Sequence, residues 1–321
     1  MPLLPWCDLP IIQAPVGSAA GADLCAAVSN AGGLGSMALT WRKPDAAREL
    51  VLEVRGKTDR TFFANFVLHF EPRSLGAALD AGVPMITFSW GDPGPYVADV
   101  RSAGALLGLQ ATSAASALAM LEWQPDFLIV QGTEAGGHVQ AHRPLVHTLL
   151  EVLGVAGSTP VFAAGGLATG ADLARVMRLG AAGGVFGTRF VATLESEAHP
   201  GYRSRIVEAS SGDTVLTSCF DGDWPYAMHR VLRNSTFDRW EAAGCPRNGL
   251  RPGEGDVVGV TASGAQLLRY EDSIPRLDTA GDWEAMALYA GTSVDRIDTI
   301  GPAADVVRDI WAGAQSLLAA G

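Results

Sequence analysis

The sequence predicts a (β/α)8 TIM barrel, an α/β fold, with a smaller cap domain that is mostly helical or irregular. Eight short apolar runs recur between residues 10 and 188, and helix-length segments separate them. The runs are continuous rather than alternating, which is typical of parallel strands covered on both faces. An open doubly wound sheet is the alternative fold, but it more often has about five or six strands.

Each expected element has its own signal. The eight strands are expected at residues 10–14, 33–38, 61–66, 84–89, 105–110, 126–132, 160–165 and 183–188. Among the helices between them, residues 169–180 begin at a capping Thr169, carry Asp172 in the first turn and stop near Gly180. Residues 112–122 begin at Thr112 or Ser113 and continue as a stripe of Ala, Leu and Met.

The strand–helix rhythm ends after residue 190. Residues 195–210 are expected to be helical, while residues 244–265 carry eight glycines or prolines and are expected to be loops. Apolar residues from Val306 to Leu318 recur at helical spacing, so a final helix should pack on the barrel. We therefore expect a barrel of residues 1–209 plus 304–321 and a cap domain of residues 210–303.

Composition and charge exclude several classes of protein. The formal net charge of −11 argues against binding to nucleic acid or to anionic membranes, which both require clusters of Lys and Arg. The four cysteines have no metal-ligand spacing, and we expect no metal site. There is no apolar run long enough to span a membrane and no signal-peptide pattern at the start, so a cytoplasmic protein is expected.

The loops after the seventh and eighth expected strands predict a phosphate site. Gly165 and Gly166 follow the seventh strand, and Gly187 and Thr188 follow the eighth. In barrels of this type the C-terminal ends of the strands form the working face, and backbone N–H groups of these two loops can bind phosphate without Lys or Arg. The alternative is that the glycines only form tight turns.

Three amide side chains stand at the ends of neighbouring strands: Asn65, Gln110 and Gln131. Amides offer both donors and acceptors, which suits the polar edge of a flat heterocycle such as an isoalloxazine. The alternative is that each amide caps a local backbone group. Lys43 and Lys57, the only lysines, lie in a helical segment, so we expect Gln110 at the place where many flavin barrels have a lysine.

His138 is the candidate base. It follows Gly136 and Gly137 in the loop "QGTEAGGH", where the glycines allow a close approach of the backbone to a ligand. An unperturbed pKa of about 6.5 would let its imidazole accept a proton near neutral pH. The alternative is a surface histidine in a mobile loop. Glu134 is expected either to orient His138 or to be solvated.

Other histidines and aromatic residues are less informative. His142, His147 and His199 are expected to face solvent, whereas His69 and His229 could line the cleft. In the expected cap, Trp224, Tyr226 and Trp240 either line a substrate cleft or, as we expect, fill a small core. The glycine-rich "AGGLGSM" of residues 31–37 opens a strand instead of following one, which is the wrong context for a dinucleotide loop.

These segments resemble the nitronate monooxygenase family, formerly called 2-nitropropane dioxygenases, over most of the chain. The resemblance lies in "PIIQAPVG", Asn65, "QGTEAGGH", "AAGGLATG" and "FGTRF". It implies an FMN-dependent barrel without a metal, in which Gly165, Gly166, Gly187 and Thr188 hold the phosphate. It further implies that Ala14, Pro15, Asn65, Gln110, Gln131, Gly132, Gly136 and Gly137 surround the rest of the cofactor and that His138 is the catalytic residue.

The resemblance also implies a reaction. Family members oxidise alkyl nitronates with dioxygen to a carbonyl compound and nitrite, and His138 would first remove the α-proton if the substrate is a neutral nitroalkane. A protonated His138 could instead stabilise a bound nitronate. The chain departs from the family pattern at Val16, where a methionine is usual, and at Ser89 and Trp90, where many relatives have a histidine. These three residues are expected to face the substrate.

Other functions remain open on the same scaffold. An FMN-dependent NAD(P)H:quinone or enoyl-thioester reductase would use the same barrel, and a flavin-free phosphate-binding isomerase or lyase would share the phosphate loops. A homodimer is compatible with the sequence, and the expected partners are a small-molecule substrate and dioxygen.

Overall fold

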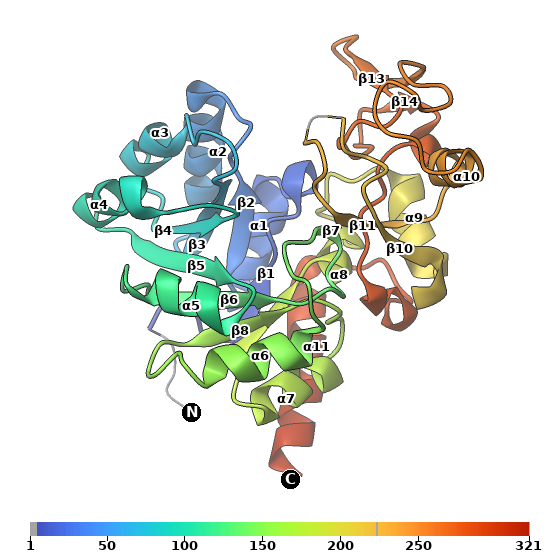
Figure 1. Ribbon diagram of the computed structural model, residues 1–321. Coiled ribbons are helices and arrows are strands. Elements are labelled where there is room, and N and C mark those ends of the chain that lie inside the picture. The colour runs from blue at the N-terminus through green and yellow to red at the C-terminus, as the bar shows by residue number, and fades with distance from the viewer. Residues whose placement is uncertain (1–4, 223, 321) are drawn as a thin grey trace.

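Eight parallel strands form a barrel in the computed structural model, which describes residues 5–222 and 224–320 (Figure 1). The strands are β1 (Ile11–Gln13), β2 (Gly35–Ala38), β3 (Phe62–Val67), β4 (Met85–Ser89), β5 (Leu106–Ala111), β6 (Phe127–Gln131), β8 (Val161–Ala164) and β9 (Gly183–Phe186). Leu34 N donates to Ile11 O at 2.9 Å and Gln13 N donates to Leu34 O at 3.0 Å, which joins β1 to the segment before β2 and closes the barrel. The predicted barrel is confirmed, and the open sheet is excluded.

Helices connect the strands and cover the barrel. They are α1 (Ala22–Asn30), α2 (Pro44–Lys57), α3 (Leu75–Asp80), α4 (Gly94–Ser102), α5 (Ala114–Leu121), α6 (Leu145–Leu153), α7 (Gly170–Arg178) and α8 (Thr188–Val191). Thr169 and Asp172 form the capping box of α7, because the Thr169 hydroxyl accepts from Asp172 N and the Asp172 carboxylate accepts from Thr169 N. Ser113 caps α5 in the same way.

Two layers of apolar side chains stabilise the barrel. The inner layer consists of Ile12, Leu34, Phe63, Met85, Phe127, Ile129, Phe162 and Val185, contributed by strands all around the barrel. Trp6 packs on Phe127 and Phe162, with ring centroids 5.1 and 5.7 Å away. A larger outer layer lies between the strands and the helices. Burial on both faces explains why the strand segments are continuously apolar.

The predicted C-terminal helix is confirmed as α11 (Ala303–Ala319). It packs against α7 so closely that a Cβ on Gly170 would lie 2.5 Å from Ala314 N and from Ile310 O. A glycine at the start of α7 therefore allows the two helix backbones to meet. No helix among the described residues combines the length and apolar character needed to cross a bilayer.

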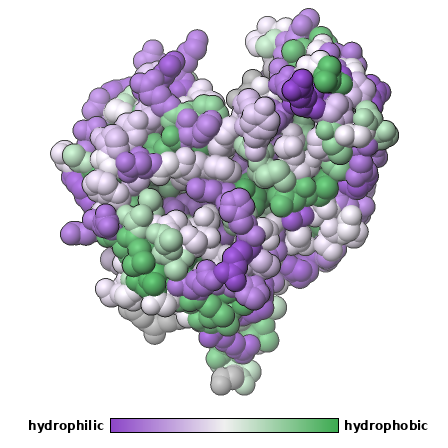
Figure 2. Space-filling model, viewed as in Figure 1, coloured by the Kyte–Doolittle hydropathy of each residue, from purple (hydrophilic) through white to green (hydrophobic). Residues whose placement is uncertain are grey.

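A smaller part of the chain lies beside the barrel mouth (Figure 1). It contains α9 (Pro200–Glu208), β10 (Thr214–Thr217), β11 (His229–Leu232), α10 (Ser235–Ala242), β12 (Val257–Val260), β13 (Gln266–Leu268) and β14 (Ala280–Gly281). Short 3-10 turns cover Gly17–Ala19 near the barrel mouth and Ser211–Asp213, Trp283–Ala285 and Thr292–Arg296 in this smaller part. Figure 2 shows that the surface is hollowed between the two parts.

Two expectations for this region need correction. The helix expected at residues 195–210 begins only at Pro200, and the loop expected at residues 244–265 contains β12. The cap is mostly helical or irregular, as expected, but the short strands of two small antiparallel sheets lie beside α10. These strands have two to four residues and pair with distant segments, so no local pattern marks them. The boundary predicted between residues 209 and 210 stays a prediction.

One of the small sheets connects the smaller part to a barrel loop. Its order is β10-β11-β7, and β7 (Gly137–His138) belongs to the loop that follows β6. His138 is the antiparallel partner of His229, and Gly137 is the partner of Arg230. Part of the expected catalytic loop is therefore a short edge strand, paired with β11 of the smaller part.

Candidate active site

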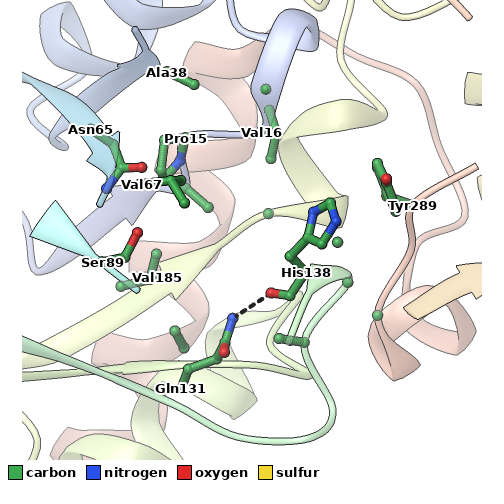
Figure 3. A pocket seen from close by; sticks show the side chains of 18 of the residues that line it. Pro15, Val16, Ala38, Asn65, Val67, Ser89, Gln131, His138, Val185 and Tyr289 are labelled. Carbon is green, nitrogen blue, oxygen red and sulfur yellow. Dashed lines mark hydrogen bonds between the residues drawn. The ribbon is translucent and has the colours of Figure 1, made fainter. Parts of the chain in front are cut away.

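A cavity opens at the C-terminal ends of the barrel strands. Its volume of about 690 Å³ is common for a ligand site. It brings together fifteen of the sixteen residues that the sequence places in the site, namely Ala14, Pro15, Val16, Asn65, Ser89, Trp90, Gln110, Gln131, Gly136, Gly137, His138, Gly165, Gly166, Gly187 and Thr188. In Figure 3, His138 and Tyr289 approach the cavity from one side, while Asn65 and Ser89 lie opposite. Residues far apart in the sequence therefore share one site.

Gly132 is the exception, because it is buried behind the cavity and does not line it. A Cβ at this position would lie 2.4 Å from the backbone of Leu145 and 2.5 Å from a carboxylate oxygen of Glu134. The glycine is thus needed for close packing against the start of α6. Its expected contact with a cofactor has no support in its position.

One end of the cavity has unused backbone donors. Gly165 and Gly166 adopt positive φ angles of 122° and 66°, which turn the chain sharply after β8. Among the described residues, the N–H groups of Gly165, Gly166, Gly187 and Thr188 donate to no other group. Several unused backbone donors that line one cavity can form an anion site.

Arg296 supports this end of the cavity from outside. Its Nη2 donates to Gly166 O at 2.6 Å, and its Nε donates to Asp172 Oδ2 at 3.1 Å. Holding the carbonyl of Gly166 from behind fixes the orientation of the neighbouring peptide planes. No local pattern predicts this contact, since Arg296 lies more than a hundred positions away from Gly166 along the chain.

The three amide side chains all have protein partners. Gln131 Nε2 donates to His138 O at 3.1 Å, and Gln131 Oε1 accepts from Gln140 N at 2.8 Å. Gln110 Nε2 donates to the Gln140 side chain at 3.1 Å, and Asn65 Nδ2 donates to Thr87 Oγ1 at 3.0 Å. Gln131 therefore connects the loop of His138 to the end of β6 by hydrogen bonds (Figure 3).

Two of these amides keep an acceptor for a ligand. Within residues 5–222 and 224–320, no group donates to Asn65 Oδ1 or to Gln110 Oε1. Both residues line the cavity. Of the two roles considered for the amides, backbone capping is seen for Gln131 and for Asn65, whose Nδ2 also donates to Thr87 O at 3.3 Å. The oxygens of Asn65 and Gln110 can in addition meet a heterocycle that has N–H donors.

His138 is fixed among aromatic rings. Its imidazole stacks on Trp224 with centroids 4.4 Å apart and an interplanar angle of 29°, and Tyr289 and His229 lie at 5.5 Å. Gly136 enables this placement, because a Cβ there would lie 2.5 Å from Gly291 N. The Nε2 atom of His138 is buried and has no hydrogen-bond partner among the described residues. A buried polar atom without a partner is costly, which marks it as a contact for a ligand.

Burial controls the charge of this imidazole. Loss of solvation, followed by the nearby His229, lowers the pKa of His138 to about 3. Burial likewise lowers the pKa of His229 to about 4, and both of its nitrogens are engaged, with Ala227 O at 2.9 Å and Phe220 N at 3.1 Å. His138 is therefore neutral at pH 7 in the free site, and its pKa is well below the unperturbed value expected from the sequence.

Glu134 has a role that the sequence did not indicate. Its carboxylate accepts from Leu145 N at 2.9 Å and thereby caps the N-terminus of α6. It neither orients His138 nor lies free in solvent, so both expectations for Glu134 were wrong. His229 also differs from its expected place in the cleft, because it is fully buried behind His138.

Aromatic residues form the wall of the cavity beside His138. Trp90 has a positive φ of 64°, an unusual conformation for a bulky residue, and contacts Trp224 at 4.6 Å. Trp224 is buried, as expected, and also lines the cavity. Trp240 packs on Phe237 as a core residue, whereas Tyr226 is 86% exposed and belongs to neither a core nor the cleft. Tyr289 also lines the cavity, and no sequence motif marks it as a site residue.

Chemically, the site combines unused backbone donors, amide acceptors and one unpartnered imidazole nitrogen. No group of three or more His, Cys, Asp or Glu residues in the described chain could hold a metal ion. The fold and the site together define a barrel protein with a large cavity at the C-terminal ends of its strands, the usual place for a ligand in this fold.

The family follows from comparison with known proteins. A family model described as nitronate monooxygenase matches residues 5–76 and 71–313. A nitronate monooxygenase from Paraburkholderia phytofirmans is 30% identical over 283 residues, covering 73% of this chain and 76% of the relative. The chain belongs to the nitronate monooxygenase family, and its relatives indicate an oxidoreductase.

Two other similar proteins carry different names. A (3aS,4S,5R,7aS)-5-hydroxy-7a-methyl-1-oxo-octahydro-1H-indene-4-carboxyl-CoA dehydrogenase from Mycobacterium tuberculosis is 33% identical over 241 residues, covering 73% of this chain but only 65% of that longer relative. The solved structure of FabK from Thermotoga maritima has a TM-score of 0.79 and 29% identity, covering 98% of this chain and 95% of that chain. The family scaffold is thus shared by proteins with several names.

Proposed function

We propose that the protein is an FMN-dependent enzyme that oxidises alkyl nitronates and nitroalkanes with dioxygen to a carbonyl compound and nitrite. The observation that carries this proposal is the buried, unpartnered Nε2 of His138 in the same cavity as four unused backbone donors. Membership of the nitronate monooxygenase family supports the same reaction.

The residues of the cavity suit FMN. The amides of Gly165, Gly166, Gly187 and Thr188 would bind its phosphate, and the oxygens of Asn65 and Gln110 would accept from the ring. When bound there, FMN would supply the electron acceptor that the oxidation of a nitronate by dioxygen requires. The cofactor would extend between the two groups of residues, because both line one continuous cavity.

His138 has a defined part in this proposal. Its neutral imidazole can accept the α-proton of a nitroalkane at Nε2, the nitrogen without a protein partner. Stacking on Trp224 holds the ring, and the two hydrogen bonds of Gln131 hold the backbone on either side of it. A bound nitronate would raise the pKa of His138, because an adjacent anion stabilises the imidazolium.

A direct test measures colour and nitrite together. The purified protein should be yellow, should bind FMN, and should release nitrite from nitroethane or its nitronate in air. His138→Asn should retain FMN and lose most turnover of the neutral nitroalkane. A colourless protein that does not bind added FMN would contradict the proposal.

A reductase is the second candidate, and the similarity to FabK and to the Mycobacterium tuberculosis dehydrogenase favours it. In that case a reduced nicotinamide would donate hydride to FMN, and a quinone or enoyl thioester would accept the electrons. Anaerobic addition of NADPH distinguishes the two functions. Bleaching of the flavin absorbance by NADPH alone supports the reductase, whereas bleaching only by a nitronate supports the monooxygenase.

A further inference from the structure

We infer that the substrate of this site is an uncharged nitro compound with an extended apolar chain or ring, which packs along a wall of aromatic side chains leading from His138 to solvent. This inference rests on the proposed function and specifies its substrate class. Three features carry it: the continuity of the wall, its rigidity and the charges around the cavity.

The aromatic wall is continuous. Trp224 contacts His138 at 4.4 Å, Phe70 contacts Trp224 at 5.2 Å, and Trp41 contacts Phe70 at 5.4 Å. All four side chains line the same cavity, and Trp41, at the outer end, is 53% exposed. A large tryptophan exposed at the entrance of an apolar passage is a contact surface that water covers poorly.

The wall is also rigid. Trp224 is stacked on His69 at 5.2 Å with an interplanar angle of 22°, so His69 as well as His138 holds its ring in place. Trp90 contacts it edge-on and keeps a strained positive φ. Strain of this kind persists where the surrounding structure requires it, often at ligand sites. A preformed apolar surface binds an apolar group without an ordering cost.

The charges around the cavity select an uncharged substrate. Among the described residues that line it, there is no Lys or Arg, and Asp272 is the only acidic side chain. His138 is neutral, and the whole chain carries a net charge of −11. A substrate with a carboxylate on its chain would lose solvation along the wall and meet no cation there. A neutral apolar chain has no charge to desolvate and can pack on the aromatic side chains of the wall.

The chemical step places the proton on the imidazole. The Cα–H bond of the neutral nitroalkane breaks, His138 Nε2 takes the proton, and the electron pair of that bond becomes the carbon–nitrogen double bond of the nitronate. The charge created on the nitro oxygens is balanced by the imidazolium. Entry as a neutral molecule therefore lets the ion pair form inside the site, where both partners are already in contact.

The test compares chain length and charge in the purified holoenzyme. We expect kcat/KM for nitrite release to rise from nitroethane to 1-nitrohexane, by up to about fourfold for each methylene that the wall buries. We expect 6-nitrohexanoate to react far more slowly than 1-nitrohexane. Trp41→Ala should lower the ratio of kcat/KM for 1-nitrohexane to that for nitroethane by about fourfold, the effect of one buried methylene, mainly through KM.

Trp123→Ala is the matched control, because Trp123 is a partly exposed tryptophan that does not line the cavity. It should leave the same ratio unchanged. Equal kcat/KM values for nitroethane and 1-nitrohexane, or equal loss of the ratio in both variants, would overturn the inference while the proposed function stands. Nitrite release from no nitro compound would instead overturn the proposed function.

A binding measurement tests the wall without turnover. Calorimetric titration of the holoenzyme with 1-hexanol should show binding with a negative heat-capacity change, which reports burial of apolar surface. Hexanoate should bind more weakly, and Trp41→Ala should weaken the binding of 1-hexanol. Hexanoate binding as tightly as 1-hexanol would contradict the charge selection and the inference with it.

Discussion

Lowering the pH from 8 to 5 should destabilise the fold through His138, by an amount that follows from its burial. The pKa of His138 is about 3 in the folded protein, against 6.5 for a solvated imidazole. Below the unfolded value, the unfolded chain binds a proton that the folded chain does not, so stability falls as pH decreases from about 7 toward 3. A pH of 5 is about 1.5 units below the pKa of the imidazole in the unfolded chain. At about 1.4 kcal/mol per unit, protonation of the unfolded chain lowers the free energy of unfolding by about 2 kcal/mol.

Urea denaturation of the wild type and of His138→Asn at both pH values measures this contribution. Between pH 8 and pH 5 the wild type should lose about 2 kcal/mol more unfolding free energy than the variant, because asparagine does not titrate. His147→Asn is the control. His147 is exposed on α6, so this variant should keep the pH dependence of unfolding free energy that the wild type shows. Equal losses in the wild type and in His138→Asn would refute the buried, neutral imidazole.

Three further predictions concern residues that hold the site in place. Gln131→Leu removes both hydrogen bonds that hold the His138 loop, so amide exchange at Gln140, measured by mass spectrometry, should accelerate about thirtyfold. Unchanged exchange at Gln140 would argue against this role of Gln131. Gly166→Val introduces a side chain at a φ of 66° with its Cβ 3.0 Å from Glu134 Cβ, so fluorescence titration should show FMN binding weakened by about 1–3 kcal/mol. An unaltered Kd for FMN would count against a phosphate site at Gly165 and Gly166. Glu134→Ala removes the cap of α6 and should lower Tm by about 1–2 °C in a thermal melt, whereas an unchanged Tm would show that the cap is dispensable.

The barrel could be predicted from the sequence because its signals are local. Continuous apolar runs mark the eight barrel strands, β1 to β6, β8 and β9, and the Thr169–Asp172 capping box marks the start of α7 without knowledge of any distant contact. The site residues follow from the same regularity, since residues just after the strands of a barrel meet at one face. Fifteen of the sixteen predicted site residues line the cavity for this reason.

The remaining features depend on contacts between distant segments. Glu134 caps α6 because Leu145 folds back on it, and Gly132 faces Leu145 instead of the cavity. The pairing of His138 with His229 joins residues more than ninety positions apart, and no periodicity predicts such a two-residue strand. The low pKa of His138 has the same origin, because its burial depends on Trp224 and Tyr289, which reach it from other loops.

A crystal structure of the protein with bound FMN tests the central claim most directly. We predict that the phosphate accepts hydrogen bonds from the amides of Gly165, Gly166, Gly187 and Thr188, and that the flavin ring lies beside Nε2 of His138. A phosphate bound elsewhere, or a flavin ring separated from His138 by protein, would contradict this account.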